Sequence, residues 1–173
     1  YLSSFKLSNK KLKNPNIYPY SVFKDKYIEP FSFAPITIFY GNNGCGKSTL
    51  LNLLGGLDKP TSGKVFINNI DITSMDEDEL AIFRRRNIGF IFQNYNLIES
   101  LTIKNNILFS PRLNKVDQKI QLEKLNELTK MLNIEEIIDK YPSQCSGGQQ
   151  QRAAIARALI NEPKIIFADE PTG

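Results

Sequence analysis

Nine consecutive residues near position 45 have the types and the spacing that can hold the phosphates of a nucleotide. They run Gly41-Asn42-Asn43-Gly44-Cys45-Gly46-Lys47-Ser48-Thr49. The glycines let the backbone curl so that successive N–H groups point inward, where a side chain would block an approaching phosphate. Lys47 can reach the β- and γ-phosphates, and the Ser48 hydroxyl can bind Mg²⁺. The pattern therefore predicts a phosphate-binding loop.

The stretches on either side of this loop are those that such a motif requires. Residues 36–40 are β-branched or aromatic, which favours a buried strand. Residues 49–54 favour the opening of a helix, whose dipole would add partial positive charge at the phosphates. The alternative is a glycine-rich turn that precedes a chance Gly-Lys-Ser. The strand–loop–helix context counts against that alternative.

Three later stretches carry further polar groups that suit phosphate chemistry. Gln93 follows an apolar stretch, residues 88–92, that is typical of a strand. Cys145-Ser146-Gly147-Gly148-Gln149 introduces a predicted helix. Asp169 and Glu170 come directly after a second apolar strand, residues 164–168. A solvated acidic pair is the plain alternative for these two, and the apolar strand before them argues against it.

In this order the motifs resemble those of the ATP-binding cassette (ABC) ATPases, from about Ile36 to the last residue. The Ser-Gly-Gly-Gln stretch at 146–149 is similar to the signature motif of that family, with Cys145 where the family usually has leucine. The pair Asp169-Glu170 is similar to the end of the Walker B strand, and Gln93 to the glutamine of the Q-loop.

The resemblance implies a role for each of these residues. Asp169 would help to hold Mg²⁺ through a water molecule, together with Ser48 and Gln93. Glu170 would be the general base, and Lys47 and Gln93 would assist catalysis. Gln93 would also report the state of the metal and the water to the helical part of the domain. Ser146, Gly147, Gly148 and Gln149 would cap an ATP molecule that a second subunit holds.

The alternation of strands and helices predicts an α/β fold with a mostly parallel, helix-flanked sheet. As a member of the P-loop NTPases, the chain would form an ABC ATPase domain over residues 36–173, with an inserted helical subdomain at about 95–148. A basic, loop-rich leader would occupy residues 1–35. The family continues past the Walker B strand with an aspartate loop and a switch histidine, and we therefore expect that the chain is a C-terminally truncated fragment that is inactive alone.

Composition agrees with a soluble domain of ordinary type. Hydrophobic residues make up 41% of the 173 positions and charged residues 23%. No stretch approaches the roughly 18 apolar residues that a membrane helix needs. The net charge of +4 comes from the leader, where six lysines face Asp25 and Glu29, and a solvated tail explains it better than a nucleic-acid patch. We expect Cys45 and Cys145 to be free thiols in a reducing compartment.

Two functions stay open from the sequence. Residues 50–63 and 94–102 resemble transporter ATPases that drive lipoprotein release, macrolide export and antimicrobial-peptide export. This resemblance implies an ATP- and Mg²⁺-dependent subunit on the cytoplasmic face of the cell membrane. Its partners would be a second copy and a membrane-spanning permease, with no direct contact to nucleic acid.

The N-terminal leader, residues 1–35, indicates a different function. Residues 30–35 resemble cytosolic P-loop ATPases of chromosome maintenance and repair, so the alternative is a soluble ABC-type ATPase that acts on DNA or ribosomes. The leader also carries four aromatic residues that could stack on adenine, and the sequence does not choose among them or against packing at the sheet edge. These are Tyr18, Tyr20, Phe23 and Tyr27.

Overall fold

The computed structural model describes residues 4–5, 31–32, 36–37 and 46–169, which fall into two compact units. The first unit is Tyr1–Leu80 and the second is Ala81–Gly173. Several predictions lie outside the described residues, namely most of the glycine-rich loop, Glu170 and the aromatic candidates for adenine stacking.

The first unit contains the helix predicted after the glycine-rich loop. This helix, α2 (Lys47–Leu54), begins two residues earlier than residues 49–54 suggest, and Gly55 ends it. Of the strand predicted over residues 36–40, only Ile36 and Thr37 are described. Neither lies in a strand, and Ile36 is 83% exposed, so this part of the prediction is wrong. A short antiparallel pair, β1 (Ser4–Phe5) with β2 (Phe31–Ser32), completes the description of the N-terminal region.

A tight hairpin follows α2. Its strands are β3 (Phe66–Ile67) and β4 (Ile70–Asp71), which pair antiparallel. Asn68 and Asn69 connect them with φ angles of 50° and 62°. A two-residue turn with both residues left-handed matches the twist of paired strands, and asparagine tolerates this conformation better than most residues.

The sequence predicts a capping box at the start of the next helix, with Ser74 as the cap and Glu77 three residues later, but helix α3 (Glu77–Asn87) begins differently. Ser74 and Glu77 fit a capping box, but Asp76 and Glu79 form the box instead. The Glu79 N–H donates to Asp76 Oδ1 over 2.8 Å, and the Asp76 N–H donates to Glu79 Oε2 over 3.1 Å. Ser74 is the last residue of the short helix η1 (Ile72–Ser74), where its hydroxyl donates to the Asp71 carbonyl, and it therefore lies two residues before the cap position of α3.

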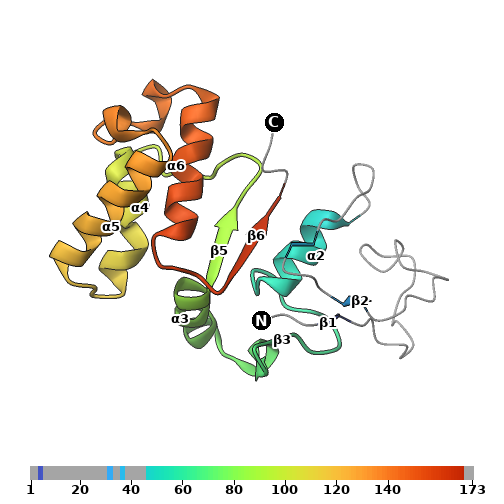
Figure 1. Ribbon diagram of the computed structural model, residues 1–173. Coiled ribbons are helices and arrows are strands. Elements are labelled where there is room, and N and C mark those ends of the chain that lie inside the picture. Colours follow the sequence, from blue (N-terminus) through green and yellow to red (C-terminus); the bar gives the residue numbers. More distant parts are fainter. Residues whose placement is uncertain (1–3, 6–30, 33–35, 38–45, 170–173) are drawn as a thin grey trace. The chain divides into compact units, whose positions relative to one another are not determined.

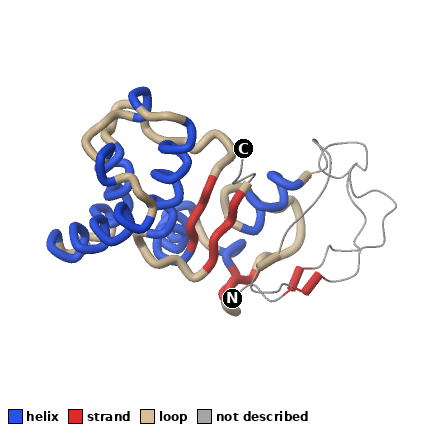
Figure 2. Tube along the Cα trace, turned by 45° about the horizontal axis from the view of Figure 1, so that its top comes forward, coloured by secondary structure: helices blue, strands red, loops and turns tan. Residues whose placement is uncertain are grey.

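The second unit is built on a parallel strand pair. Strand β5 (Ile88–Ile91) pairs with β6 (Ile165–Ala168), with Ile88 opposite Ile165 and Ile91 opposite Ala168. Figures 1 and 2 both show the two strands side by side. The carboxyl ends of the strands consequently lie at the same edge, and the residues that follow each strand become neighbours.

Helices lie beside this strand pair (Figure 1). The helical subdomain predicted at about residues 95–148 contains two α-helices, α4 (Ile103–Leu113) and α5 (Gln118–Met131). Two short 3₁₀ turns, η2 (Glu135–Ile137) and η3 (Pro142–Gln144), lead to α6 (Gly147–Leu159). No helix in the described part of the chain has the length and apolar character needed to span a bilayer.

Helices α4, α5 and α6 share one apolar core. Small alanines on α6 let neighbouring elements approach closely, and Ala153, Ala154 and Ala156 are fully buried. At Gly89 of β5 the approach is closer still, because an added Cβ would lie 2.6 Å from the Ala158 carbonyl oxygen. The core consists of Ile103, Ile107, Leu108, Leu125, Ile134, Ile137, Ala153, Ala156 and Ile160.

Candidate nucleotide-binding site

The start of α2 carries the described end of the predicted phosphate-binding loop. Gly46 precedes the helix with φ 93° and ψ 13°, a left-handed conformation that favours glycine. Since Gly46 has no side chain, the helix start carries no side-chain cap, and its first turn holds no acidic residue. Lys47, Ser48 and Thr49 form that first turn, where the helix dipole favours an anion. Gly41, Asn42, Gly44 and Cys45 lie outside the described residues.

Two predicted metal ligands follow the neighbouring strands of the second unit. Asp169 comes directly after β6, and its backbone N–H donates to the Ile91 carbonyl at the end of β5 over 2.9 Å. Gln93 stands two residues beyond Ile91. The structure thus brings Gln93 and Asp169 to one edge of the strand pair. Lys47 and Ser48 belong to the first compact unit, while these two residues belong to the second.

The start of α6 has a complete cap of its own. The Gln149 N–H donates to the Ser146 hydroxyl over 3.3 Å, and the Ser146 N–H donates to Gln149 Oε1 over 2.8 Å. This capping box fixes the first turn of α6 without a ligand. The Ser146 hydroxyl accepts this bond with a lone pair, which leaves its own proton available to an incoming acceptor.

Gly147 and Gly148 complete this first turn, and the fold does not require glycine at either position. A Cβ on Gly147 would lie 3.5 Å from the Tyr95 hydroxyl, and one on Gly148 would lie 3.6 Å from Arg152 Nη1. Both distances are ordinary van der Waals contacts, and neither residue has a left-handed φ. What two glycines do provide is a bare helix start that a ligand can approach closely.

Cys145 stands just before this helix and behaves as a small apolar residue. It is a free thiol that packs against the apolar core of the second unit. Its Sγ lies 3.4 Å from the Tyr141 carbonyl oxygen, and burial raises the pKa of the thiol. The Gln150 amide holds the preceding turn, since its Nε2 donates to the carbonyls of Pro142 and Cys145 over 3.0 and 3.1 Å. A cysteine in place of leucine therefore leaves the helix start well fixed.

The connection from β5 to α4 carries Gln93, and two residues absent from the sequence prediction hold it. Asn106, which is 1% exposed, accepts from the Ile98 N–H over 2.7 Å and donates to the Ile98 and Leu101 carbonyls over 3.0 Å each. Arg157 of α6 donates to the carbonyls of Tyr95 and Asn96. The signal in the sequence is slight. It consists of one polar residue, Asn106 or Arg157, among the apolar positions on the buried face of each predicted helix.

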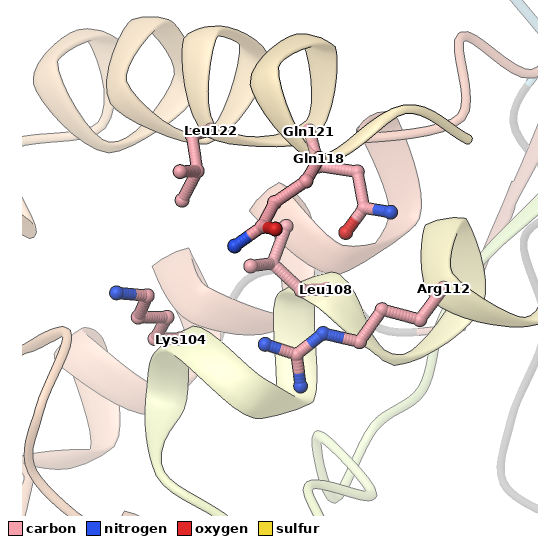
Figure 3. A pocket seen from close by; sticks show the side chains of 6 residues that line it. All are labelled: Lys104, Leu108, Arg112, Gln118, Gln121 and Leu122. Carbon is pink, nitrogen blue, oxygen red and sulfur yellow. The ribbon is translucent and has the colours of Figure 1, made fainter. Parts of the chain in front are cut away.

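A cavity of about 350 Å³ lies apart from all the predicted site residues. It opens between α4 and α5, and Figure 3 shows the side chains that line it. Lys104 and Arg112 supply two positive charges, and no acidic residue is among the lining. The lining residues are Lys104, Leu108, Arg112, Gln118, Gln121 and Leu122.

Comparison with known proteins places this arrangement in context. A family model described as "ABC transporter" matches residues 32–173. The bacitracin export ATP-binding protein BceA of Halalkalibacterium halodurans is 51% identical over 149 residues, which is 86% of this chain and 58% of that protein. The lipoprotein-releasing system ATP-binding protein LolD of Buchnera aphidicola subsp. Schizaphis graminum is 46% identical over 79% of this chain and 60% of that protein.

The structure of this chain is also similar to solved structures of ATP-binding cassettes. The ATP-binding cassette MJ0796, in a dimeric post-hydrolysis state bound to ADP and Pi, superposes with a TM-score of 0.69. It is 46% identical and the match covers 73% of this chain and 56% of that one. This likeness confirms the predicted P-loop NTPase fold class. The chain spans a little over half the length of the curated relatives named above.

Proposed function

Because the chain belongs to the ABC transporter family, we propose that it binds and hydrolyses ATP to drive a transporter, in an ATP-bridged pair with a second copy. The observation that carries the proposal is the bare, pre-capped start of α6. Its two glycines serve neither backbone conformation nor packing, which leaves ligand approach as their purpose. A phosphate is the ligand that a glycine-rich helix start suits best.

The residues at the end of the β5–β6 pair suit Mg²⁺. Asp169 offers carboxylate oxygens and Gln93 an amide oxygen, and Mg²⁺ prefers such oxygen ligands and keeps part of its water shell. The Ser48 hydroxyl would supply a further oxygen ligand. When bound, Mg²⁺ offsets the negative charge of the phosphates. Lys47 then places its ammonium group on the β- and γ-phosphates, where it forms charge-assisted hydrogen bonds.

Hydrolysis needs a base beside the metal ligands. Glu170 follows Asp169 directly in the sequence, and Asp169 comes directly after β6. We assign Glu170 the removal of a proton from the attacking water, and Gln93 the orientation of that water. Loss of the γ-phosphate passes through a loose transition state, for which positioning and charge stabilisation supply most of the rate enhancement.

The second copy supplies the other half of each site. Ser146, Gly147 and Gly148 of one subunit would donate N–H and hydroxyl groups to the γ-phosphate of ATP held at Lys47 of its partner, with Gln149 closing the cap. The dimeric state of the similar cassette MJ0796 with ADP and Pi supports this arrangement. Two ATP molecules would be buried at the interface and hold the two subunits together.

The transport task is inferred from the relatives. One of them is named for bacitracin export and another for lipoprotein release. We propose an exporter of this type, with a membrane-spanning permease as partner and a place on the cytoplasmic face of the membrane. Any contact with the membrane would pass through the permease. No observation in the described residues favours the alternative of an ATPase that acts on DNA or ribosomes.

The proposal is tested in the protein at its natural length. With Glu170→Gln, hydrolysis should stop while ATP still binds, and light scattering should show a dimer that depends on ATP. Adding Gly148→Asp places a carboxylate against the phosphate. The dimer should then disappear, while calorimetry shows ATP binding to each monomer within about threefold of the Glu170→Gln parent. A Glu170→Gln protein that binds no ATP, or that stays monomeric with ATP, would contradict the proposal.

A further inference from the structure

The segment that carries Gln93 contains a turn that needs support from outside itself. Tyr95 and Asn96 are consecutive residues with left-handed φ angles of 59° and 46°. Within the turn, the Tyr95 N–H donates to the Phe92 carbonyl over 2.9 Å, and the Asn96 N–H donates to the Asn94 carbonyl over 2.6 Å. Left-handed residues other than glycine carry backbone strain and persist where their surroundings hold them.

Arg157 supplies this support from α6. Its Nη2 donates to the Tyr95 carbonyl over 2.7 Å, and its Nη1 donates to the Asn96 carbonyl. The two acceptors are the carbonyls of the two strained residues. The planar guanidinium presents parallel donors and remains charged even though burial lowers the pKa of Arg157. One rigid group thus fixes both peptide planes of the turn.

The same segment also meets the start of α6. The Tyr95 hydroxyl lies 3.5 Å from the place of a Cβ on Gly147, the first residue of α6, whereas Arg157 lies in its last turn. The segment therefore contacts α6 at both ends of the helix. Further along, Asn106 fastens Ile98 and Leu101 to α4. Between these ties the chain from Gln93 to Thr102 has little freedom to move apart from the helices.

We propose that Arg157 is a positioning residue that locks the Gln93 segment to α6, so that Gln93 and the start of α6 move as one body. The inference rests on the proposed function, in which Gln93 lies at the metal and residues 146–149 reach the partner's ATP. A change at Gln93 would then shift the helix start that completes the partner's site. Arg157 touches neither ATP nor metal, and acts through the turn that it holds.

The test compares Arg157→Lys with Arg112→Lys in the protein at natural length. Lysine keeps the charge but cannot hold two carbonyls with one planar group. Arg112 is the control, because it donates to Asn105 of its own helix. We expect backbone amides of residues 93–97 to exchange hydrogen about tenfold faster in Arg157→Lys, without nucleotide, and at the parent rate in Arg112→Lys. We also expect kcat to fall about tenfold while the KM for ATP stays within about twofold.

Unchanged exchange in the segment, or an unchanged kcat, in a folded Arg157→Lys protein overturns the proposal. The nucleotide-free exchange experiment is independent of the ATPase assignment. A parent without ATPase activity would refute the proposed function and leave the Arg157 contact to be judged by exchange alone.

A second measurement avoids any risk of misfolding, since it leaves Arg157 in place. In the Glu170→Gln protein, segment 93–97 and the α6 start at 145–150 should gain protection from exchange together, with the same midpoint in ATP concentration. Protection of one without the other would show that they do not move as one body.

Discussion

Two helix starts carry most of the proposed chemistry, and they are built in opposite ways. At α2, Gly46 is left-handed, so the backbone itself needs glycine and the helix has no side-chain cap. At α6, Ser146 and Gln149 close a capping box, and neither the backbone nor the packing needs Gly147 or Gly148. The α2 start owes its shape to the conformation of its glycine. The α6 start is complete without a ligand and is left bare on its outer side.

The comparison shows that a glycine can be needed at a helix start for two different reasons, which cannot be told apart in the sequence. One is conformational, as at Gly46, and a substitution there should damage the fold and the binding together. The other is access, as at Gly148, where a bulky or charged substitution should weaken only the contact with the ATP held by the partner subunit. Gly89 adds a third reason, because an added Cβ would press on the backbone of α6. We therefore expect substitutions at these three glycines to differ in how far they lower the free energy of unfolding, with the largest loss at Gly89, a smaller loss at Gly46 and none at Gly148.

The largest effect is expected at Gly89. In Gly89→Ala the new methyl would lie 2.6 Å from the Ala158 carbonyl oxygen and 3.1 Å from Pro163 Cγ, and backbone atoms cannot rotate away. We expect the free energy of unfolding to fall by about 3 kcal/mol, at the upper end for overpacking. Urea denaturation measures this change. The matched control is Gly148→Ala, which should be neutral or should stabilise α6 by up to about 1 kcal/mol. Equal losses in both variants would contradict the ranking.

A smaller effect is expected at Gly46. Alanine at a φ of 93° should cost about 1–2 kcal/mol in backbone strain. Gly63 is a suitable control, since it has the same φ of 93° and an added Cβ there would meet no atom within 4 Å. Both variants should lose similar stability in urea denaturation. Calorimetry should show that only Gly46→Ala weakens ATP binding, and equal ATP affinity in the two variants would remove Gly46 from the site.

The smallest effect on stability is expected at the two cysteines that precede the helix starts, Cys45 and Cys145. We expect these two thiols to differ in how fast maleimide labels them, with little effect of either residue on the free energy of unfolding. Burial raises the pKa of Cys145, so its thiolate is scarcer at neutral pH and forms only as the pH rises further. Cys45 belongs to the predicted phosphate-binding loop and precedes Lys47 by two residues, and we expect the N–H groups and the lysine of that loop to favour its thiolate. Maleimide should therefore label Cys45 faster at pH 7, block ATP binding, and be slowed by ATP. Mass spectrometry of Cys45→Ser and Cys145→Ser proteins measures both rates, and faster labelling of Cys145 would reverse the assignment.

Much of the fold follows from local patterns in the sequence. The apolar strands before Gln93 and Asp169, the helix after Lys47 and the glycine stop at Gly55 are all set by neighbouring residues, and the structure has them. The cap of α3 was predicted at the wrong residue. Ser74 and Asp76 both have a glutamate three residues later, and the choice depends on η1, which ends at Ser74 and leaves α3 to begin after Asp76.

The hydrogen bonds that Arg157 and Asn106 make to the Gln93 segment could not be predicted from the sequence, for a different reason. Arg157 bonds to backbone carbonyls more than 60 residues earlier, and Asn106 bonds to carbonyls of the connection before α4. Backbone carbonyls are present at every residue, so no pairing of side-chain types reveals such a contact. The crowding at Gly89 is likewise visible only once α6 is packed on β5.

The central claim is that the α2 start of one subunit and the α6 start of another complete one nucleotide site. It is tested most directly by mixing two defective proteins, Lys47→Ala and Gly148→Asp, both carrying Glu170→Gln so that bound ATP persists. If the halves of a site come from different subunits, a mixed dimer keeps one intact site, although each protein alone has none. We expect light scattering to show ATP-dependent dimers in the mixture and in neither protein alone. Monomers in the mixture at saturating ATP would contradict the account.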